Sequence, residues 1–134
     1  MILPPQKIII AQSNIHGWGV FAKEIIREEE IIEETPFIHL FKKGEEDLKI
    51  NKNMLIDYRF SFPASINWQQ QVIPMGYGCV YNHSDNPNAR WETFEETNIF
   101  KFIALRDIAI GEEICTYYGP AYYWNNGREH IDVK

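Results

Sequence analysis

Residues 82–88 read NHSDNPN, and six of these seven residues carry an amide, imidazole, hydroxyl or carboxylate side chain. The segment directly follows GYGCVY at 76–81, whose aromatic and apolar composition indicates burial. Asn, Asp, Ser and Pro are typical turn residues, but a turn needs only a few of them. A polar segment this dense must satisfy its hydrogen bonds somewhere, and ligand binding is one way to do so.

Two further segments flank this one in the chain. Residues 17–22 read GWGVFA, and residues 111–119 read GEEICTYYG. A lone GxG or a GEE before a strand is common, whereas NHSxxPN is more specific. The order GxGVFA, NHSxxPN, GEExxxxYG within one small domain resembles the SET-domain family of protein lysine methyltransferases. The resemblance spans residues 8 to about 124 and is greatest to the short, free-standing members.

The size and composition predict a single domain with one core, because the chain has 134 residues and 19 of them are aromatic. No apolar run approaches membrane-spanning length, and the start MILPP lacks the zones of a signal peptide. We therefore expect a soluble, cytoplasmic protein, with the nucleus or a host compartment as alternatives.

The two cysteines, Cys79 and Cys115, are too few for a cysteine-based zinc site. The histidines also lack the spacing of metal ligands; they are His16, His39, His83 and His130. We expect buried thiols in a reducing compartment and no metal.

The net charge is 13 minus 19, or −6, which argues against direct nucleic-acid binding. It favours cationic partners such as a lysine-rich, histone-like peptide by long-range attraction. The alternative is that the acidic surface only maintains solubility. The sequence leaves the oligomeric state open.

The apolar pattern predicts a mainly-β domain of short strands and frequent turns. Strands are expected over 7–12, 20–22, 31–41, 54–62, 90–94, 99–104 and 114–118. Pro36 places its strand at an edge or bend, residues 63–71 read as a loop, and a surface insert is expected near 42–71. The resemblance implies the SET fold (β-clip), in which small curved sheets surround a C-terminal segment threaded in a pseudoknot-like arrangement. Residues 120–134 would then close the domain with aromatic side chains.

Gly17 and Gly19 bracket a predicted tight turn, where missing Cβ atoms allow close approach of a ligand and positive φ. A plain β-turn is the alternative. The resemblance implies that this turn presents its backbone to S-adenosylmethionine, with S-adenosylhomocysteine as product. Trp18 would stack on the adenine or cap the core.

Asn82 and His83 supply directed donors and acceptors. The resemblance implies that this pair holds the amino-acid and adenine ends of the cofactor. A lone histidine is more often a hydrogen-bonded core residue, but the complete motif favours binding here. The rest of the segment is interpreted as a scaffold: Ser84, Asn86, Pro87 and Asn88.

Tyr118 ends the third motif and, by resemblance, holds the position of the catalytic tyrosine, next to the cofactor. Methyl transfer from a sulfonium to an amine is an in-line displacement that needs close approach and a deprotonated amine, without a covalent intermediate. A tyrosine hydroxyl can orient the amine lone pair. The alternative is that the tyrosines around residue 118 only close an aromatic core.

Aromatic walls in such enzymes hold the lysine stem and attract cations. The substrate channel is assigned to Tyr81, Trp91, Thr116, Tyr122, Tyr123 and Trp124. Relatives often carry Tyr-x-Gly where residues 33–37 read EETPF, so a channel tyrosine is missing or replaced, with Trp91 or Tyr58 as candidates. Many relatives also append a three-cysteine zinc segment that this sequence lacks. Because Thr116 occupies a position that is aromatic in many relatives, the degree of methylation stays open.

Three functions remain to be distinguished. The leading hypothesis is an S-adenosylmethionine-dependent protein-lysine N-methyltransferase. The alternative is a catalytically silent SET-like module that binds a lysine-containing peptide or a partner protein, favoured by the altered EETPF segment. A cofactor-free β-domain is the third.

Overall fold

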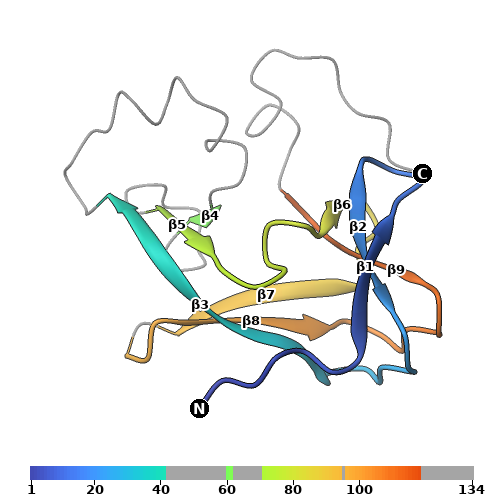
Figure 1. The fold of residues 1–134 in the computed structure, drawn as a ribbon, viewed down its shortest axis with the longest axis horizontal. Helices are drawn as coiled ribbons and strands as arrows, with labels where there is room; N and C mark the ends of the chain where they lie inside the picture. The colour runs from blue at the N-terminus through green and yellow to red at the C-terminus, as the bar shows by residue number, and fades with distance from the viewer. Residues whose placement is uncertain (42–59, 62–70, 95, 119–134) are drawn as a thin grey trace.

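The computed structural model describes residues 1–41, 60–61, 71–94 and 96–118 (Figure 1). Within these ranges nine strands form two sheets and there is no helix. The predicted mainly-β class, built of short curved sheets, is therefore confirmed. None of the described residues forms a helix long and apolar enough to cross a membrane.

The four-stranded sheet brings the three sequence motifs together. Its strands are β1 (Ile8–Gln12), β2 (Trp18–Ala22), β9 (Glu113–Thr116) and β6 (Asn82–His83), in that order across the sheet. The pairs β1–β2 and β2–β9 are antiparallel, whereas β6 runs parallel to β9. The segments at 17–22, 82–88 and 111–119 thus each contain one of three strands of this sheet, with β9 between β2 and β6 (Figure 1).

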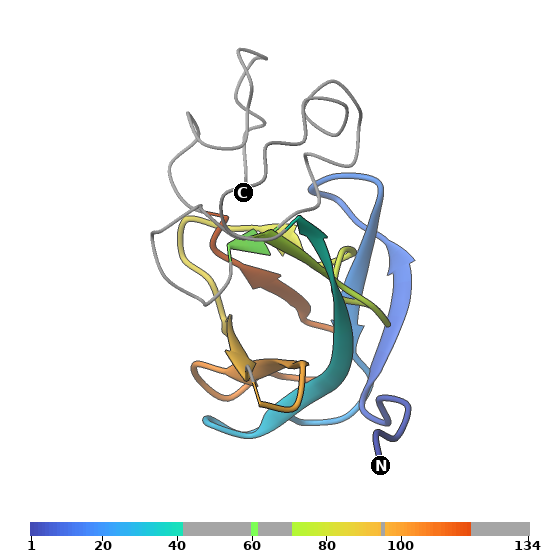
Figure 2. The ribbon, with the colours of Figure 1, turned by 90° about the vertical axis from the view of Figure 1, so that its left-hand side faces the viewer.

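The five-stranded sheet is antiparallel throughout. Its order is β4 (Phe60–Ser61), β5 (Gln71–Pro74), β3 (Ile31–Phe41), β8 (Ile99–Ala104) and β7 (Ala89–Phe94). The long strand β3 shifts register near both of its ends, and Figure 2 shows that it curves along its length. Register shifts of this kind bend a strand and increase its twist.

The core lies between the two sheets and follows from the alternation of the strands. Phe100 and Phe102 of β8 are buried, and the ring of Tyr81 stacks on Phe102 with centroids 4.1 Å apart. Val20 and Ile114 add buried side chains from the other sheet. The loop before β6 is therefore held by an aromatic ring inserted into the core.

Several sequence-based expectations need correction. Gly19 lies inside β2 and not in a turn, and residues 71–74 form a strand where a loop was expected to end. Residues 82–83 form β6 within the polar segment. The predicted strands at 31–41 and 99–104 are confirmed.

Pro36 lies in a central strand, so the expected edge position is wrong, whereas the alternative of a bend agrees with the curvature of β3 (Figure 2). The ladder from β3 to β8 ends at the pair Pro36–Ile99, and the ladder to β5 begins at Phe37–Pro74. Each neighbour thus covers only half of β3. A residue without an N–H is tolerated there because both ladders end at this point.

The insert expected near 42–71 lies mostly outside the described residues, although Phe60–Ser61 and Gln71 take part in strands. The aromatic closing segment at 120–134 lies outside them altogether, as does any threading of the chain beyond Tyr118.

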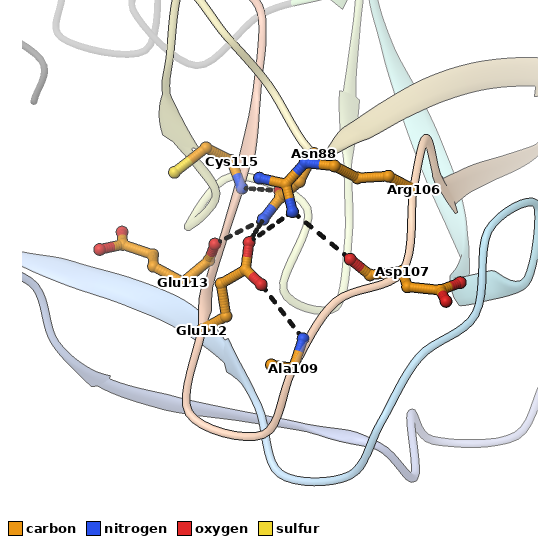
Figure 3. A network of polar contacts seen from close by, with 7 residues as sticks. All are labelled: Asn88, Arg106, Asp107, Ala109, Glu112, Glu113 and Cys115. Atoms are coloured by element: carbon orange, nitrogen blue, oxygen red, sulfur yellow. Dashed lines mark hydrogen bonds and ion pairs between the residues drawn. The ribbon is translucent and has the colours of Figure 1, made fainter.

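Asn88 joins the polar segment to β9 (Figure 3). Its Nδ2 donates to the Glu113 carbonyl at 2.8 Å and to Glu112 Oε2 at 3.0 Å, and its Oδ1 accepts from the Cys115 N–H at 2.8 Å. Glu112 also accepts from Arg106. Although burial raises the pKa of Glu112, the hydrogen bonds from the Ala109 N–H, Asn88 and Arg106 together lower it. The scaffold role expected for Asn88 is confirmed.

Replacing the Asn88 side chain should destabilise the fold more than replacing the exposed side chain of Asn86. Asn88→Ala leaves the buried Cys115 N–H without its acceptor, which costs roughly 1–3 kcal/mol of unfolding free energy. Asn86, in the same segment, is exposed. Asn86→Ala should change the unfolding free energy by less than about 0.5 kcal/mol. Urea unfolding of both variants checks this, and equal losses would show that Asn88 is not the anchor.

Candidate functional site

Asn82 holds the three motifs together. Its Nδ2 donates to the carbonyl oxygens of His16 at 3.1 Å and Trp18 at 3.2 Å, and to Glu113 Oε2 at 2.8 Å. Asn82 is buried. The GWG segment and Asn82, which the resemblance assigns to the same cofactor, are therefore in direct contact.

Gly19 has a different role from the one expected. Gly17 adopts φ +50°, as predicted for the turn, but Gly19 is buried in β2. A Cβ at Gly19 would lie 3.0 Å from Glu113 Cδ and 3.1 Å from Asn82 Nδ2. The missing side chain therefore admits the Glu113 carboxylate and the Asn82 amide.

The imidazole of His83 acts as a clamp between two segments. Its Nδ1 accepts from the Tyr118 N–H at 2.9 Å, so the ring hydrogen is on Nε2, which lies 2.7 Å from Asp85 Oδ1. The ring is buried. Since both nitrogens are engaged, His83 can meet a cofactor through its backbone and not through its ring nitrogens.

Tyr118 lies against the start of the polar segment. Its hydroxyl donates to the carbonyl oxygen of Tyr81, and its ring lies 5.2 Å from that of His83. The backbone of Ser84 adds a hydrogen bond to the Thr116 carbonyl at 3.0 Å. The C-terminal motif is thus fixed to 81–84 at three points.

Behind Tyr81 lies a buried carboxylate. The Tyr81 hydroxyl donates to Glu33 Oε1 at 2.8 Å, and the Tyr77 N–H donates to Glu33 Oε2 at 2.8 Å. Burial raises the pKa of Glu33, although both hydrogen bonds oppose the change. Burial, followed by the neighbouring Glu33, also raises the pKa of Tyr81 well above its usual range. Tyr81 therefore stays protonated and gives the site its carbonyl, while its ring belongs to the core.

A family model described as "SET domain" matches residues 17–119. This chain belongs to the SET-domain family. A Schizosaccharomyces pombe relative is named as a histone-lysine N-methyltransferase specific for H3 lysine-37. It is 31% identical to this chain, and the matched region covers 87% of this chain and 76% of the relative. Because this relative is named as a histone-lysine N-methyltransferase, the predicted enzyme class of protein-lysine methyltransferases is confirmed.

Two solved structures share the fold. One is a Plasmodium falciparum protein provisionally named as a histone methyltransferase, with a TM-score of 0.68 and 33% identity. The match covers 88% of this chain and 97% of the Plasmodium chain. The other is CpSET8 from Cryptosporidium, with a TM-score of 0.65 and 26% identity. The match covers 84% of this chain and 57% of the Cryptosporidium chain.

The remaining predicted residues of this SET domain are placed as follows. Trp18 is 60% exposed, and its own backbone carbonyl accepts the hydrogen bond from Asn82. Trp91 packs on Phe100 with centroids 5.2 Å apart. Thr116 is fully buried, and among the described residues its Oγ1 has no hydrogen-bond partner. Four aromatic residues named above lie outside the described part of the chain: Tyr58, Tyr122, Tyr123 and Trp124.

Of the two thiols expected to be buried, Cys115 is buried and Cys79 is half-buried. Burial and, second, nearby carboxylates raise the pKa of Cys79 to about 11 and that of Cys115 to about 12.

Sequence reasoning missed two carboxylates of the site. Glu113 was quoted only as part of the GEE motif and given no role, but its side chain accepts from Ser13 Oγ and Asn82 Nδ2. Glu33 was read only as a departure from the family pattern. A usable signal was its alternation with Thr35 and Phe37 along β3, since all three are buried.

The two glycines should respond differently to a methyl group. Gly19→Ala crowds Glu113 and Asn82 and should cost roughly 1–3 kcal/mol of stability. Gly17→Ala meets no atom within 4 Å and should cost about 1 kcal/mol, because of its positive φ alone. The NMR signals of the Asn82 side-chain amide check the cause. They should shift strongly in Gly19→Ala and little in Gly17→Ala; the reverse order would contradict the packing described.

The raised pKa of Glu33 predicts a pH dependence with a definite sign. From the ordinary value of 4.5 up to the raised pKa, the folded state binds more protons at Glu33 than the unfolded state. Its contribution to the unfolding free energy therefore falls as pH rises through that window. Glu33→Gln removes this dependence. In urea unfolding across a pH series, the native-minus-variant difference should decline above about pH 4.5 and then level off. A constant or rising difference would refute a raised pKa.

Proposed function

We propose that this SET domain transfers a methyl group from S-adenosylmethionine to the side-chain amine of a protein lysine. The observation that carries the proposal is the Tyr118 hydroxyl, held by Tyr81 directly before Asn82 and His83. The cofactor would supply an electrophilic methyl group on a sulfonium.

The described residues fit such a cofactor. Asn82 is anchored through its Nδ2, and its Oδ1 accepts no hydrogen bond from any residue that the structure describes. Exposed Trp18 offers an aromatic face close by. We therefore assign Asn82, Trp18 and the backbone of Gly17, Gly19 and His83 to binding.

Tyr118 would act by orientation. Its hydroxyl donates its hydrogen to the Tyr81 carbonyl, so toward a substrate its oxygen acts as an acceptor. Such an acceptor can orient an amine by accepting a hydrogen bond from one of its N–H groups. The nitrogen lone pair then points at the methyl group. The Tyr81 carbonyl is a second acceptor at the same place. This arrangement contributes proximity and alignment rather than a covalent step.

The substrate is proposed to be a lysine within a basic, histone-like segment. The net charge of −6 favours such a partner over acidic ones. The name of the Schizosaccharomyces pombe relative, which refers to a lysine of histone H3, points to the same class of substrate.

Removal of one hydroxyl tests the mechanism. Tyr118→Phe should retain fold and cofactor affinity but lower turnover by roughly 100-fold or more, because the lost interaction is made mainly at the barrier. Tyr117→Phe is the matched control, since the Tyr117 ring is 46% exposed and next to the same histidine. It should lose little turnover.

Mass spectrometry of a methylated peptide, at saturating cofactor, measures both rates. Equal losses would assign the tyrosines to packing alone. Absence of methylation by the native protein, together with tight binding of a lysine peptide, would favour the silent module.

The charge of the substrate gives a separate expectation. A peptide with its lysine among basic residues should be methylated faster than one with acidic neighbours, and the advantage should shrink as salt rises from about 0.05 to 0.5 M. Initial rates on the two peptides at both salt concentrations check this. Equal rates at low salt would argue against electrostatic selection.

A further inference from the structure

The Glu113 carboxylate lies at the junction of β2, β6 and the loop between β1 and β2. Ser13 Oγ lies 2.7 Å from Oε1 and 2.9 Å from Oε2, and Asn82 Nδ2 donates to Oε2 at 2.8 Å. Ser13 is itself fixed, because its Oγ accepts from the Ile15 N–H at 2.9 Å. The carboxylate is therefore held from one side and holds Asn82 on the other.

This arrangement determines which way the Asn82 amide faces. Three acceptors surround one end of the side chain: two backbone carbonyls and Glu113. Only the NH₂ group can face them, because a rotated amide would place Oδ1 against three oxygens. The acceptor Oδ1 must then point away from Glu113, and no described residue donates to it.

We propose that Glu113, held by Ser13, is a positioning residue that aims Asn82 Oδ1 at the α-ammonium group of the methyl donor. The inference rests on the proposed function and adds to it a role for two residues outside the expected site. An acceptor next to a carboxylate favours a cationic donor over a neutral one. Of the groups on S-adenosylmethionine that donate hydrogen bonds, the α-ammonium is the cationic one.

Two ligands that differ by one amine separate this role from general support. Calorimetry would compare S-adenosylhomocysteine with its analogue in which hydrogen replaces the α-amino group. The native protein should prefer the amine by about 10-fold or more. In Glu113→Ala this preference should fall towards one, because Asn82 is no longer oriented.

Glu112→Ala is the matched control, since Glu112 supports the same strand through Asn88 and Arg106 without touching Asn82. It should lower stability and leave the amine preference intact. If Glu113→Ala does not fold, Glu113→Gln and Ser13→Ala allow the same comparison and should each reduce the preference.

The outcomes are distinct. Equal weakening of both ligands in the Glu113 and Ser13 variants, with the preference unchanged, would overturn the positioning role. Equal affinity of the native protein for the two ligands would also overturn it, while the proposed function would stand. Failure of the native protein to bind either ligand would overturn the proposed function itself.

Discussion

The amide of Asn82 is the contact on which the arrangement of the site depends. It bonds two carbonyls of the segment that leads into β2 and the carboxylate of the first residue of β9. These partners are far apart in sequence, so their approach costs chain entropy that the core packing must offset. Once they are joined, the four-stranded sheet holds all three motifs on neighbouring strands.

A second layer supports this contact from the five-stranded sheet. Glu33 of β3 binds the Tyr81 hydroxyl, and the Tyr81 carbonyl binds Tyr118. A buried carboxylate is costly unless its oxygens are paired, and here each oxygen accepts one hydrogen bond. The position of the Tyr118 hydroxyl thus follows from both sheets, which explains how a small domain can hold it firmly.

The sequence predicted those parts of the fold whose signal is local. Strand β8 follows from the alternation of Phe100 and Phe102, and β1 from its β-branched run. Strand β6 could not be predicted in this way, because its two polar residues pair with a distant parallel partner. The need for glycine at position 19 could not be predicted either, since the atoms that a Cβ there would crowd belong to Asn82 and Glu113. For the site, the motif residues were found through family resemblance, whereas the hydrogen-bond partners of the two carboxylates behind them required the three-dimensional contacts.

The Asn82 amide joins the three motifs and, in the proposed function, also binds the methyl donor. Calorimetric titration of S-adenosylmethionine into the native protein and Asn82→Ala, with circular dichroism to verify folding, tests this most directly. We expect the folded variant to bind roughly 5-fold to 100-fold more weakly than the native protein, as for loss of a buried hydrogen-bonding group. A folded Asn82→Ala protein that binds as tightly as the native protein would contradict the account.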